Sequence, residues 1–304
     1  MIVCDTHCHF FSAGFFRTLS KELPTTQDQD QVAAAADTLA ETLGWQAPGT
    51  DKALADRWAG ELDRHHVARA MFIASVPGDE ASVAAAAARH PGRFVGAFMF
   101  NPVAPETEAR IDRAFGELNL TTACLFPAMH GYSMDDEAVA AVCRSAERHR
   151  RAVFVHCGLL SVGVRKKLGL PSRFDLRKGD PLAVAAIAVR YPGVPFVIPH
   201  FGAGLFREAL MAADMAPNIV LDTSSSNAWI KFTPGLTLRE VFARALDCVG
   251  PSRLLFGTDS SFFPRGWHAA IFEGQQAILA DLGANESDQQ LVFGDNFSRV
   301  FAGE

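Results

Sequence analysis

The stretch Ile2-Val3-Cys4-Asp5-Thr6-His7-Cys8-His9 opens the chain. Its apolar start, Ile2 to Cys4, is typical of a buried β-strand. Side chains on a strand alternate between its two faces, so His7 and His9 point to the same side. Two neutral imidazoles that converge from one strand suit a divalent metal ion. Such a pair also arises by chance on exposed strands, and the His-x-His spacing alone does not distinguish the two cases.

Further apolar, β-rich runs alternate with helical patterns along the chain. The expected strands are 2–6, 70–75, 94–100, 122–126, 152–156, 195–199, 219–222 and 253–258. Most are continuously apolar, as expected for parallel strands that are covered on both faces. Helix signals lie between them, such as a stop at Pro91-Gly92 and a cap followed by proline at Asp180-Pro181. Eight βα units without a linker predict one (β/α)8 TIM barrel domain over residues 1–304.

An insertion separates the first strand from the first long helix, over roughly residues 10–51. It is rich in aromatic residues, including Phe11, Phe15 and Trp45. One interpretation is a packed surface excursion with short helices. The other is a lid over the barrel mouth, because the segment leaves the carboxyl end of a strand, where barrel active sites form.

Composition limits the classes of partner. The chain has 304 residues, of which 49% are hydrophobic and 20% charged, which suits a folded protein with a substantial core. The net charge of -6 argues against nucleic acid as a partner. Apolar tracts such as Leu182 to Val189 are too short to cross a membrane. Six scattered cysteines without a Cys-x-x-Cys motif, and no basic leader before the first strand, predict reduced thiols in a cytoplasmic protein.

Three further metal-binding side chains lie at the carboxyl ends of predicted strands: His156, His200 and Asp259. Each alone has a structural explanation, such as capping a neighbouring helix. In a parallel barrel, however, all strand carboxyl ends open on one face, so these residues can converge with His7 and His9. Their coincidence on separate strands predicts a metal site on that face.

Four segments resemble motifs of the amidohydrolase superfamily, in the order that the superfamily has them: Asp5-Thr6-His7-Cys8-His9, Val155-His156-Cys157-Gly158, Ile198-Pro199-His200-Phe201-Gly202 and Leu255-Phe256-Gly257-Thr258-Asp259. More narrowly, the chain is similar to the amidohydrolase-related (family 2) branch, which includes aminocarboxymuconate-semialdehyde decarboxylase, related aromatic-acid decarboxylases, and lactone or amide hydrolases. The resemblance covers nearly the whole chain.

The resemblance implies that His7, His9, His156 and Asp259 bind one divalent metal ion. His200 would be the catalytic histidine or a weak further ligand, and both roles stay open. Relatives with two metals carry a modified lysine or a glutamate after strand 4, where this chain reads Thr122-Ala-Cys-Leu-Phe-Pro-Ala128. A single ion is therefore expected, with zinc favoured and manganese the alternative. The resemblance also allows a homodimer.

The site predicts a hydrolase in which metal-activated water attacks a small ester, lactone or amide that carries a carboxylate. Asp259 would hold that water or accept its proton, and His200 would polarise a carbonyl or move a proton. The first alternative is a metal-dependent, non-oxidative decarboxylase (carboxy-lyase) of an aromatic or unsaturated acid. The second is a metal-binding barrel without catalytic activity.

Four residues are candidates for substrate binding. Arg173 lies in a basic loop after strand 5 and is the preferred partner of a substrate carboxylate. Arg265 and His268 follow Asp259, where they either line the pocket or pack at a helix start. Arg57 precedes strand 2 at a position where some relatives bind substrate, although surface exposure is its simpler interpretation.

Overall fold

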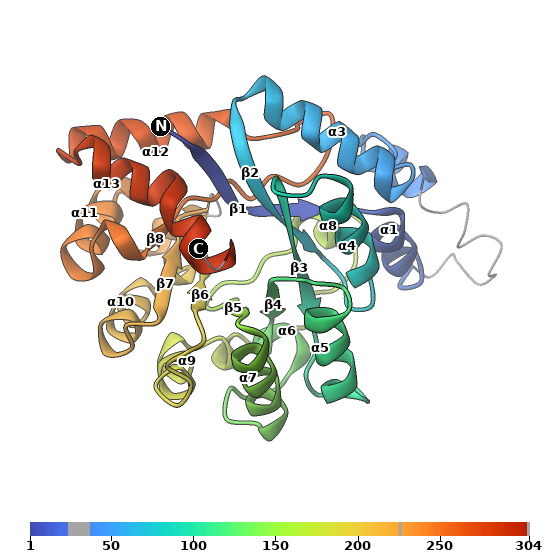
Figure 1. Cartoon of the computed structure of the whole chain (residues 1–304), viewed down its shortest axis with the longest axis horizontal. Helices are drawn as coiled ribbons and strands as arrows, with labels where there is room; N and C mark the ends of the chain where they lie inside the picture. The colour runs from blue at the N-terminus through green and yellow to red at the C-terminus, as the bar shows by residue number, and fades with distance from the viewer. Residues whose placement is uncertain (24–36, 225–226, 303–304) are drawn as a thin grey trace.

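The structure is a computed structural model that describes residues 1–23, 37–224 and 227–302 (Figure 1). Within these residues, eight parallel strands form one sheet in sequential order, and helices surround it. The strands are β1 (Val3–Phe10), β2 (Val67–Ala74), β3 (Phe94–Phe100), β4 (Thr122–Leu125), β5 (Ala152–Val155), β6 (Phe196–Ile198), β7 (Ile219–Asp222) and β8 (Leu254–Leu255). The predicted TIM barrel is confirmed.

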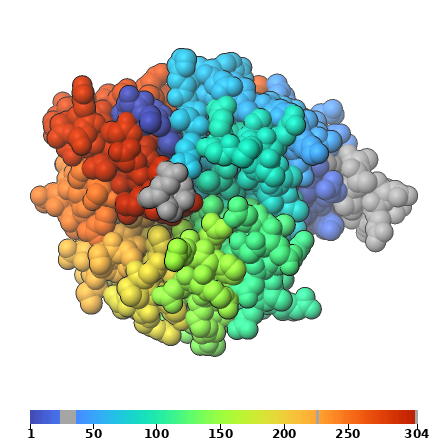
Figure 2. All heavy atoms as spheres, viewed as in Figure 1, coloured from blue at the N-terminus to red at the C-terminus, as the bar shows by residue number. Residues whose placement is uncertain are grey.

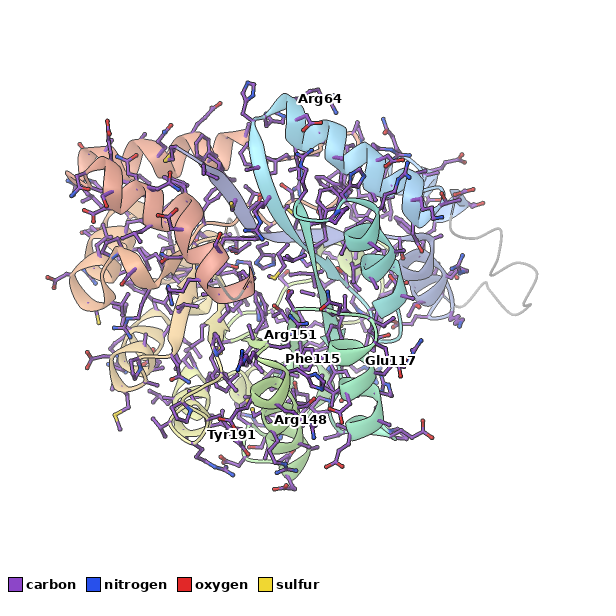
Figure 3. All side chains as sticks on the ribbon, in the orientation of Figure 1. Arg64, Phe115, Glu117, Arg148, Arg151 and Tyr191 are labelled. Atoms are coloured by element: carbon purple, nitrogen blue, oxygen red, sulfur yellow. The ribbon has the colours of Figure 1, made fainter. Side chains whose placement is uncertain are left out.

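Helices surround the strands, and most of them form the outer layer of the barrel. They are α1 (Ala13–Ser20), α3 (Asp51–Arg64), α4 (Glu80–Arg89), α5 (Thr107–Gly116), α6 (Pro127–His130), α7 (Glu137–His149), α8 (Gly163–Lys167), α9 (Pro181–Ala188), α10 (Phe206–Met215), α11 (Leu238–Val249), α12 (Ala269–Asp281) and α13 (Glu286–Gln290). The Asp180 carboxylate caps α9 by accepting a hydrogen bond from the Leu182 amide at 2.9 Å, as the sequence predicts. Charged side chains such as Arg64 and Arg148 lie exposed on the outer side of this layer (Figure 3).

Both faces of the sheet are buried, which explains the continuously apolar strands. Met71 on β2 and Ala97 on β3 belong to the cluster inside the barrel. Their neighbours Phe72 and Phe98 belong to the larger cluster between strands and helices. This alternation follows from the two-residue period of a strand, with each face packed against a different apolar layer.

The barrel closes between β1 and the segment after β8. β8 itself is shorter than the predicted strand 253–258, because beyond Leu255 the backbone bonds to β1 instead of extending the β7 ladder. The Asp259 amide donates to the His7 carbonyl at 2.8 Å, and the His9 amide donates to the Ser260 carbonyl at 2.7 Å. β1 is longer than the predicted strand 2–6, and both histidines therefore lie within it.

The carboxyl-terminal segment covers one end of the barrel. Helical residues Leu291–Asp295 and Ser298–Ala302 follow α13 and cross the centre of the strand ring in Figure 1. Phe297 packs with barrel-interior residues such as Cys4. The same segment lies beside the amino-terminal residues on the face shown in Figure 2.

The expected insertion over residues 10–51 falls in part on residues 24–36, which lie outside the described residues. Its described part contains α1, and the Ser12 hydroxyl caps this helix by accepting from the Phe15 amide at 3.0 Å. Among the described helices, none is long and apolar enough to cross a membrane.

Candidate metal centre

A cavity of about 1090 Å³ opens at the carboxyl ends of the strands. Every side chain that the sequence singled out for the metal or for catalysis lines it: His7, His9, His156, His200 and Asp259. The barrel topology brings them together from β1, β5, β6 and the segment after β8, because parallel strands all end on this face.

Among the described residues, His7, His9 and Asp259 form a tight group of side chains that could hold a metal ion. One ligand atom of each lies within 4.8 Å of the other two. The distance to Asp259 Oδ1 is 3.0 Å from His9 Nε2 and 3.9 Å from His7 Nε2. Asp259 has a left-handed backbone with φ of 59°. That conformation is unfavourable for a non-glycine residue and is held by its bond to the β1 carbonyl.

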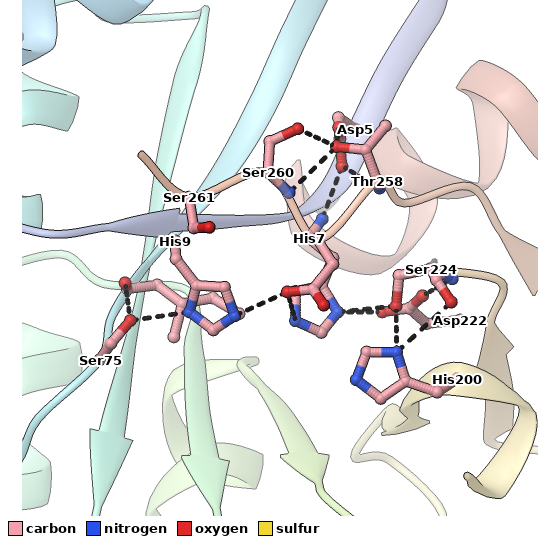
Figure 4. A network of polar contacts seen from close by, with 12 residues as sticks. Asp5, His7, His9, Ser75, His200, Asp222, Ser224, Thr258, Ser260 and Ser261 are labelled. Atoms are coloured by element: carbon pink, nitrogen blue, oxygen red, sulfur yellow. Dashed lines mark hydrogen bonds and ion pairs between the residues drawn. The ribbon is translucent and has the colours of Figure 1, made fainter. Parts of the chain in front are cut away.

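Hydrogen bonds on the far side of each ring orient the two β1 histidines (Figure 4). His7 Nδ1 lies 2.7 Å from Asp222 Oδ2. His9 Nδ1 lies 2.7 Å from the Ser75 hydroxyl, which itself donates to the Ile73 carbonyl. Both rings therefore turn Nε2 toward Asp259. Such second partners are the usual means of fixing a metal-binding imidazole.

Asp222 and Ser224 belong to the site, although neither was predicted from the sequence. The Ser224 hydroxyl lies 3.0 Å from His7 Nδ1 and 2.8 Å from His200 Nδ1. A signal was available, because Asp222 ends the predicted strand 219–222, as His156 ends its own. The sequence does not show whether a carboxylate at a strand end would bind the metal or support one of its ligands. Only the structure places Asp222 against Nδ1 of His7, on the far side of the ring from Asp259.

His156 and His200 occupy the neighbouring part of the cavity. Their ring centroids are 5.4 Å apart, and those of His200 and His7 are 5.0 Å apart. His156 lies outside the tight group of His7, His9 and Asp259. Its Nδ1 is buried without a hydrogen-bond partner, which is costly for a polar atom unless a further group binds the ring.

The charges of the site are divided between its residues. Burial disfavours the charged form of His7, but the adjacent Asp222 carboxylate prevails and raises the pKa of His7 to about 8. Burial lowers the pKa of both His156 and His200, so both are neutral at pH 7. Burial opposes ionisation of Asp222 and Asp259, yet neighbouring histidines lower the pKa of each.

These residues fit a divalent metal ion. Three donors of the types that zinc and manganese accept lie within 4.8 Å of one another, and the ring of His156 on the same cavity has an unpartnered buried nitrogen.

A buried aspartate supports the site from below. Asp5 accepts hydrogen bonds from the His7 amide at 2.9 Å, from the Thr258 hydroxyl at 2.5 Å and from Trp267 Nε1 at 2.7 Å. It joins β1 to the segment that carries Asp259. The β1–β2 register shifts between Asp5 and Cys8, at the point where these bonds form. Cys8 and Cys157 are buried in the larger apolar cluster between strands and helices.

The four predicted substrate-binding residues divide into two pairs. Arg173 and Arg265 line the cavity, and Arg265 donates to the Asp259 carbonyl at 3.0 Å. Arg57 and His268 are not among the lining residues. Arg57 instead donates to the Ala47 carbonyl at 3.1 Å and lies over the Phe263 ring, because α3 turns this side chain toward the segment before it. His268 precedes α12 and donates its amide to the Ser260 hydroxyl at 3.0 Å.

Aromatic residues of the segment after β1 pack over the cavity as a separate cluster. Phe11 stacks on Phe15, with ring centroids 4.1 Å apart, and Trp45 stacks on Phe262 at 4.3 Å. The cluster also includes residues of the α8 region such as Val164. Phe11, Phe15 and Trp45 thus line the cavity.

Comparisons with known proteins agree with this architecture. One curated relative is Protein fluG of Emericella nidulans, which is 28% identical over 104 residues. The matched part is 34% of this chain and 12% of fluG, so the chain spans only about an eighth of that relative. The crystal structure of 5-carboxyvanillate decarboxylase LigW from Sphingomonas paucimobilis is 15% identical and superposes with a TM-score of 0.64, covering 99% of both chains. A probable 2-pyrone-4,6-dicarboxylic acid hydrolase from Acinetobacter baumannii, solved with citric acid bound, is 14% identical with a TM-score of 0.62, covering 99% of this chain and 100% of the other.

A metal is present in a further similar structure. An amidohydrolase from Burkholderia multivorans with bound zinc is 14% identical with a TM-score of 0.60, covering 99% of both chains. These identities establish the shared fold. The model of the amidohydrolase family (Amidohydro_2) matches residues 4–302. The chain therefore belongs to the amidohydrolase family.

Proposed function

We propose that this protein is a metal-dependent hydrolase that acts on a small, carboxylate-bearing ester, lactone or amide. The observation that carries the proposal is the convergence of His7, His9 and Asp259 within 4.8 Å of one another, in the cavity that also contains His200. One divalent ion would be held by His7, His9, Asp259 and His156. Three histidine nitrogens and one carboxylate oxygen are ligands that favour zinc, with manganese as the alternative. Such an ion supplies Lewis acidity, which polarises a substrate oxygen and acidifies water.

The reaction needs a proton acceptor, and His200 suits this role. Burial lowers its pKa, so its imidazole is neutral at pH 7. Its Nδ1 contacts Ser224, which leaves Nε2 to accept a proton. A decarboxylase would instead need a group that delivers a proton to carbon, and a neutral His200 is less suited to that.

Decarboxylation of an aromatic or unsaturated acid is the second candidate. It is favoured by the planar and apolar side chains on the cavity wall, including Phe126, Phe154 and Trp229. An aromatic ring would pack well against such a wall.

A substrate panel separates the two reactions. Zinc- or manganese-loaded protein is incubated with carboxylated lactones, esters and amides and with aromatic acids, and both proton release and CO2 are followed. We expect proton release from the lactones, esters or amides without CO2. Evolution of CO2 from an aromatic acid would replace the proposal with decarboxylation. Inactivity toward the whole panel would favour a metal-binding barrel without catalytic activity.

Arg173 is proposed to bind the substrate carboxylate, since it lies exposed on the cavity wall. We expect Arg173→Gln to lower kcat/KM for carboxylated substrates by about 10–100-fold, chiefly through KM, because an ionic hydrogen bond contributes about 1.5–3 kcal/mol. The control is Arg177→Gln, on the same loop but paired with Asp175. Equal losses on an uncarboxylated analogue would contradict this role.

A further inference from the structure

We infer that Asp222 is a positioning residue that fixes the tautomers of both His7 and His200, acting on the second through Ser224. The two imidazoles come from β1 and from the segment after β6, and Asp222 ends β7, which pairs with β6 in the sheet. Figure 4 shows the four side chains in one continuous chain of contacts. The tautomers do not depend on the proposed metal centre. Only the expected effect on metal affinity rests on it.

In the hydrogen bond between His7 and Asp222, the imidazole is the donor and the carboxylate is the acceptor. Asp222 is fully buried, and in a close carboxyl–imidazole pair the proton lies on the imidazole, because a carboxyl group is ordinarily the stronger acid. An ionised carboxylate only accepts hydrogen bonds, so His7 Nδ1, 2.7 Å away, must carry the proton. When the ring is neutral, His7 Nε2 is therefore the unprotonated nitrogen, on the side of Asp259.

His200 is likewise the donor in its contact with Ser224. The amide of Ser224 donates to Asp222 Oδ1, which holds Ser224 beside the two histidines. The Ser224 hydroxyl lies 2.8 Å from His200 Nδ1. The Ser224 carbonyl, which can only accept, lies 3.4 Å from the same nitrogen. His200 thus presents Nε2 unprotonated, as a proton acceptor requires.

The surrounding backbone leaves little room for another arrangement. A Cβ atom on Gly257 would lie 2.8 Å from His7 Cβ and 3.1 Å from both Asp222 Oδ1 and Ser224 Cβ. The chain after β8 therefore packs directly against the network. Close packing of this kind restricts the rotamers of the neighbouring side chains. The fold therefore keeps Nδ1 of both histidines in contact with Asp222 or Ser224.

Nitrogen NMR of the histidine rings in the metal-free protein tests the assignment. At about pH 9.5, above the pKa of about 8 for His7, both rings are neutral, and we expect the Nδ1-protonated tautomer for both His7 and His200 in the native protein. Ser224→Ala should change the signals of His200 and leave His7 as the Nδ1-protonated form. Asp222→Asn should change both, because an amide can donate to His7 Nδ1 and its uncharged oxygen holds the Ser224 amide, and so the contact with His200, more weakly. An Nε2-protonated His7 or His200 in the native protein would overturn the inference.

Thr223→Val supplies the matched control. Thr223 lies between Asp222 and Ser224 but bonds to Gln275 at 2.6 Å, so its substitution removes a buried hydrogen bond that faces away from the histidines. It should destabilise the fold without changing either tautomer. If Asp222→Asn fails to fold, the comparison of Ser224→Ala with Thr223→Val still tests whether Ser224 fixes the tautomer of His200. Identical His200 signals in these two variants would overturn that part of the inference.

Binding of Zn²⁺ to metal-free protein is the second measurement. Loss of the partner of a ligating histidine weakens metal binding by about 10–100-fold, which we expect for Asp222→Asn. Ser224→Ala and Thr223→Val should bind Zn²⁺ within about threefold of the native protein, since His7 keeps its carboxylate. Native affinity in Asp222→Asn would overturn the role of Asp222 toward His7. Absence of Zn²⁺ binding in the native protein would instead refute the metal centre, and the NMR result would still decide the tautomers.

Discussion

We expect Asp259→Asn to weaken the binding of Zn²⁺ or Mn²⁺ by more than ~100-fold. Loss of a group that merely orients a ligand already weakens binding by about 10–100-fold, so loss of a charged ligand should weaken it further. Asp259 Oδ1 lies 3.0 Å from His9 Nε2, and both residues belong to the tight donor group of the described residues. Asparagine keeps the shape of the side chain but removes the negative charge that would compensate a divalent ion.

Competition with a chromophoric chelator measures this affinity. Asp175→Asn is the control, because Asp175 lies on the same face, on the loop after β5, where it pairs with Arg177 rather than with a histidine. The control should bind metal like the native protein. Equal affinity of Asp259→Asn and the native protein would remove Asp259 from the metal site, and retained hydrolysis in that variant would remove it from catalysis.

The substitution Gly158→Ala should destabilise the protein by about 3 kcal/mol or more, through overpacking and backbone strain together. Gly158 follows His156 after β5 and has φ of 66°, in the left-handed region that favours glycine. A Cβ atom there would lie 2.3 Å from the Gly202 carbonyl oxygen and 2.4 Å from that of Ala203. Both obstacles are backbone atoms, so the loops that carry His156 and His200 would have to separate.

Chemical denaturation measures the loss, with Gly60→Ala as the control. Gly60 lies in α3, where an added Cβ would meet nothing within 4 Å. That substitution should leave stability unchanged or raise it by up to about 1 kcal/mol, because alanine favours the helix. If Gly158→Ala were as stable as the native protein, the close contact between the ends of β5 and β6 would be refuted.

Much of the architecture was predictable because buried parallel strands leave a simple signal. The ranges 94–100 and 219–222 coincide with β3 and β7, since apolar runs bounded by polar or turn residues are what such strands require. The prediction was least accurate where pairing partners change. Beyond Leu255 the chain bonds to β1 rather than to β7, and strand propensity carries no information about that choice.

The candidate site was predictable for a related reason. A barrel aligns all strand ends on one face, so His7, His9, His156, His200 and Asp259 could be assigned to one place without any distance. Arg57 shows the limit of such reasoning. Its position along the chain suggested the cavity, but the orientation of α3 turns it to the Ala47 carbonyl instead.

The sequence by itself determined the TIM barrel, the common face and the types of atom that a metal would meet, because these depend on period, order and residue chemistry. Only the tertiary structure decided which nitrogen of each histidine faces the cavity. That choice depends on contacts between residues far apart in the chain, such as His7 with Asp222 and His9 with Ser75. A hydrogen bond of about 2.7 Å is a short-range, directional interaction, and strand order cannot specify it.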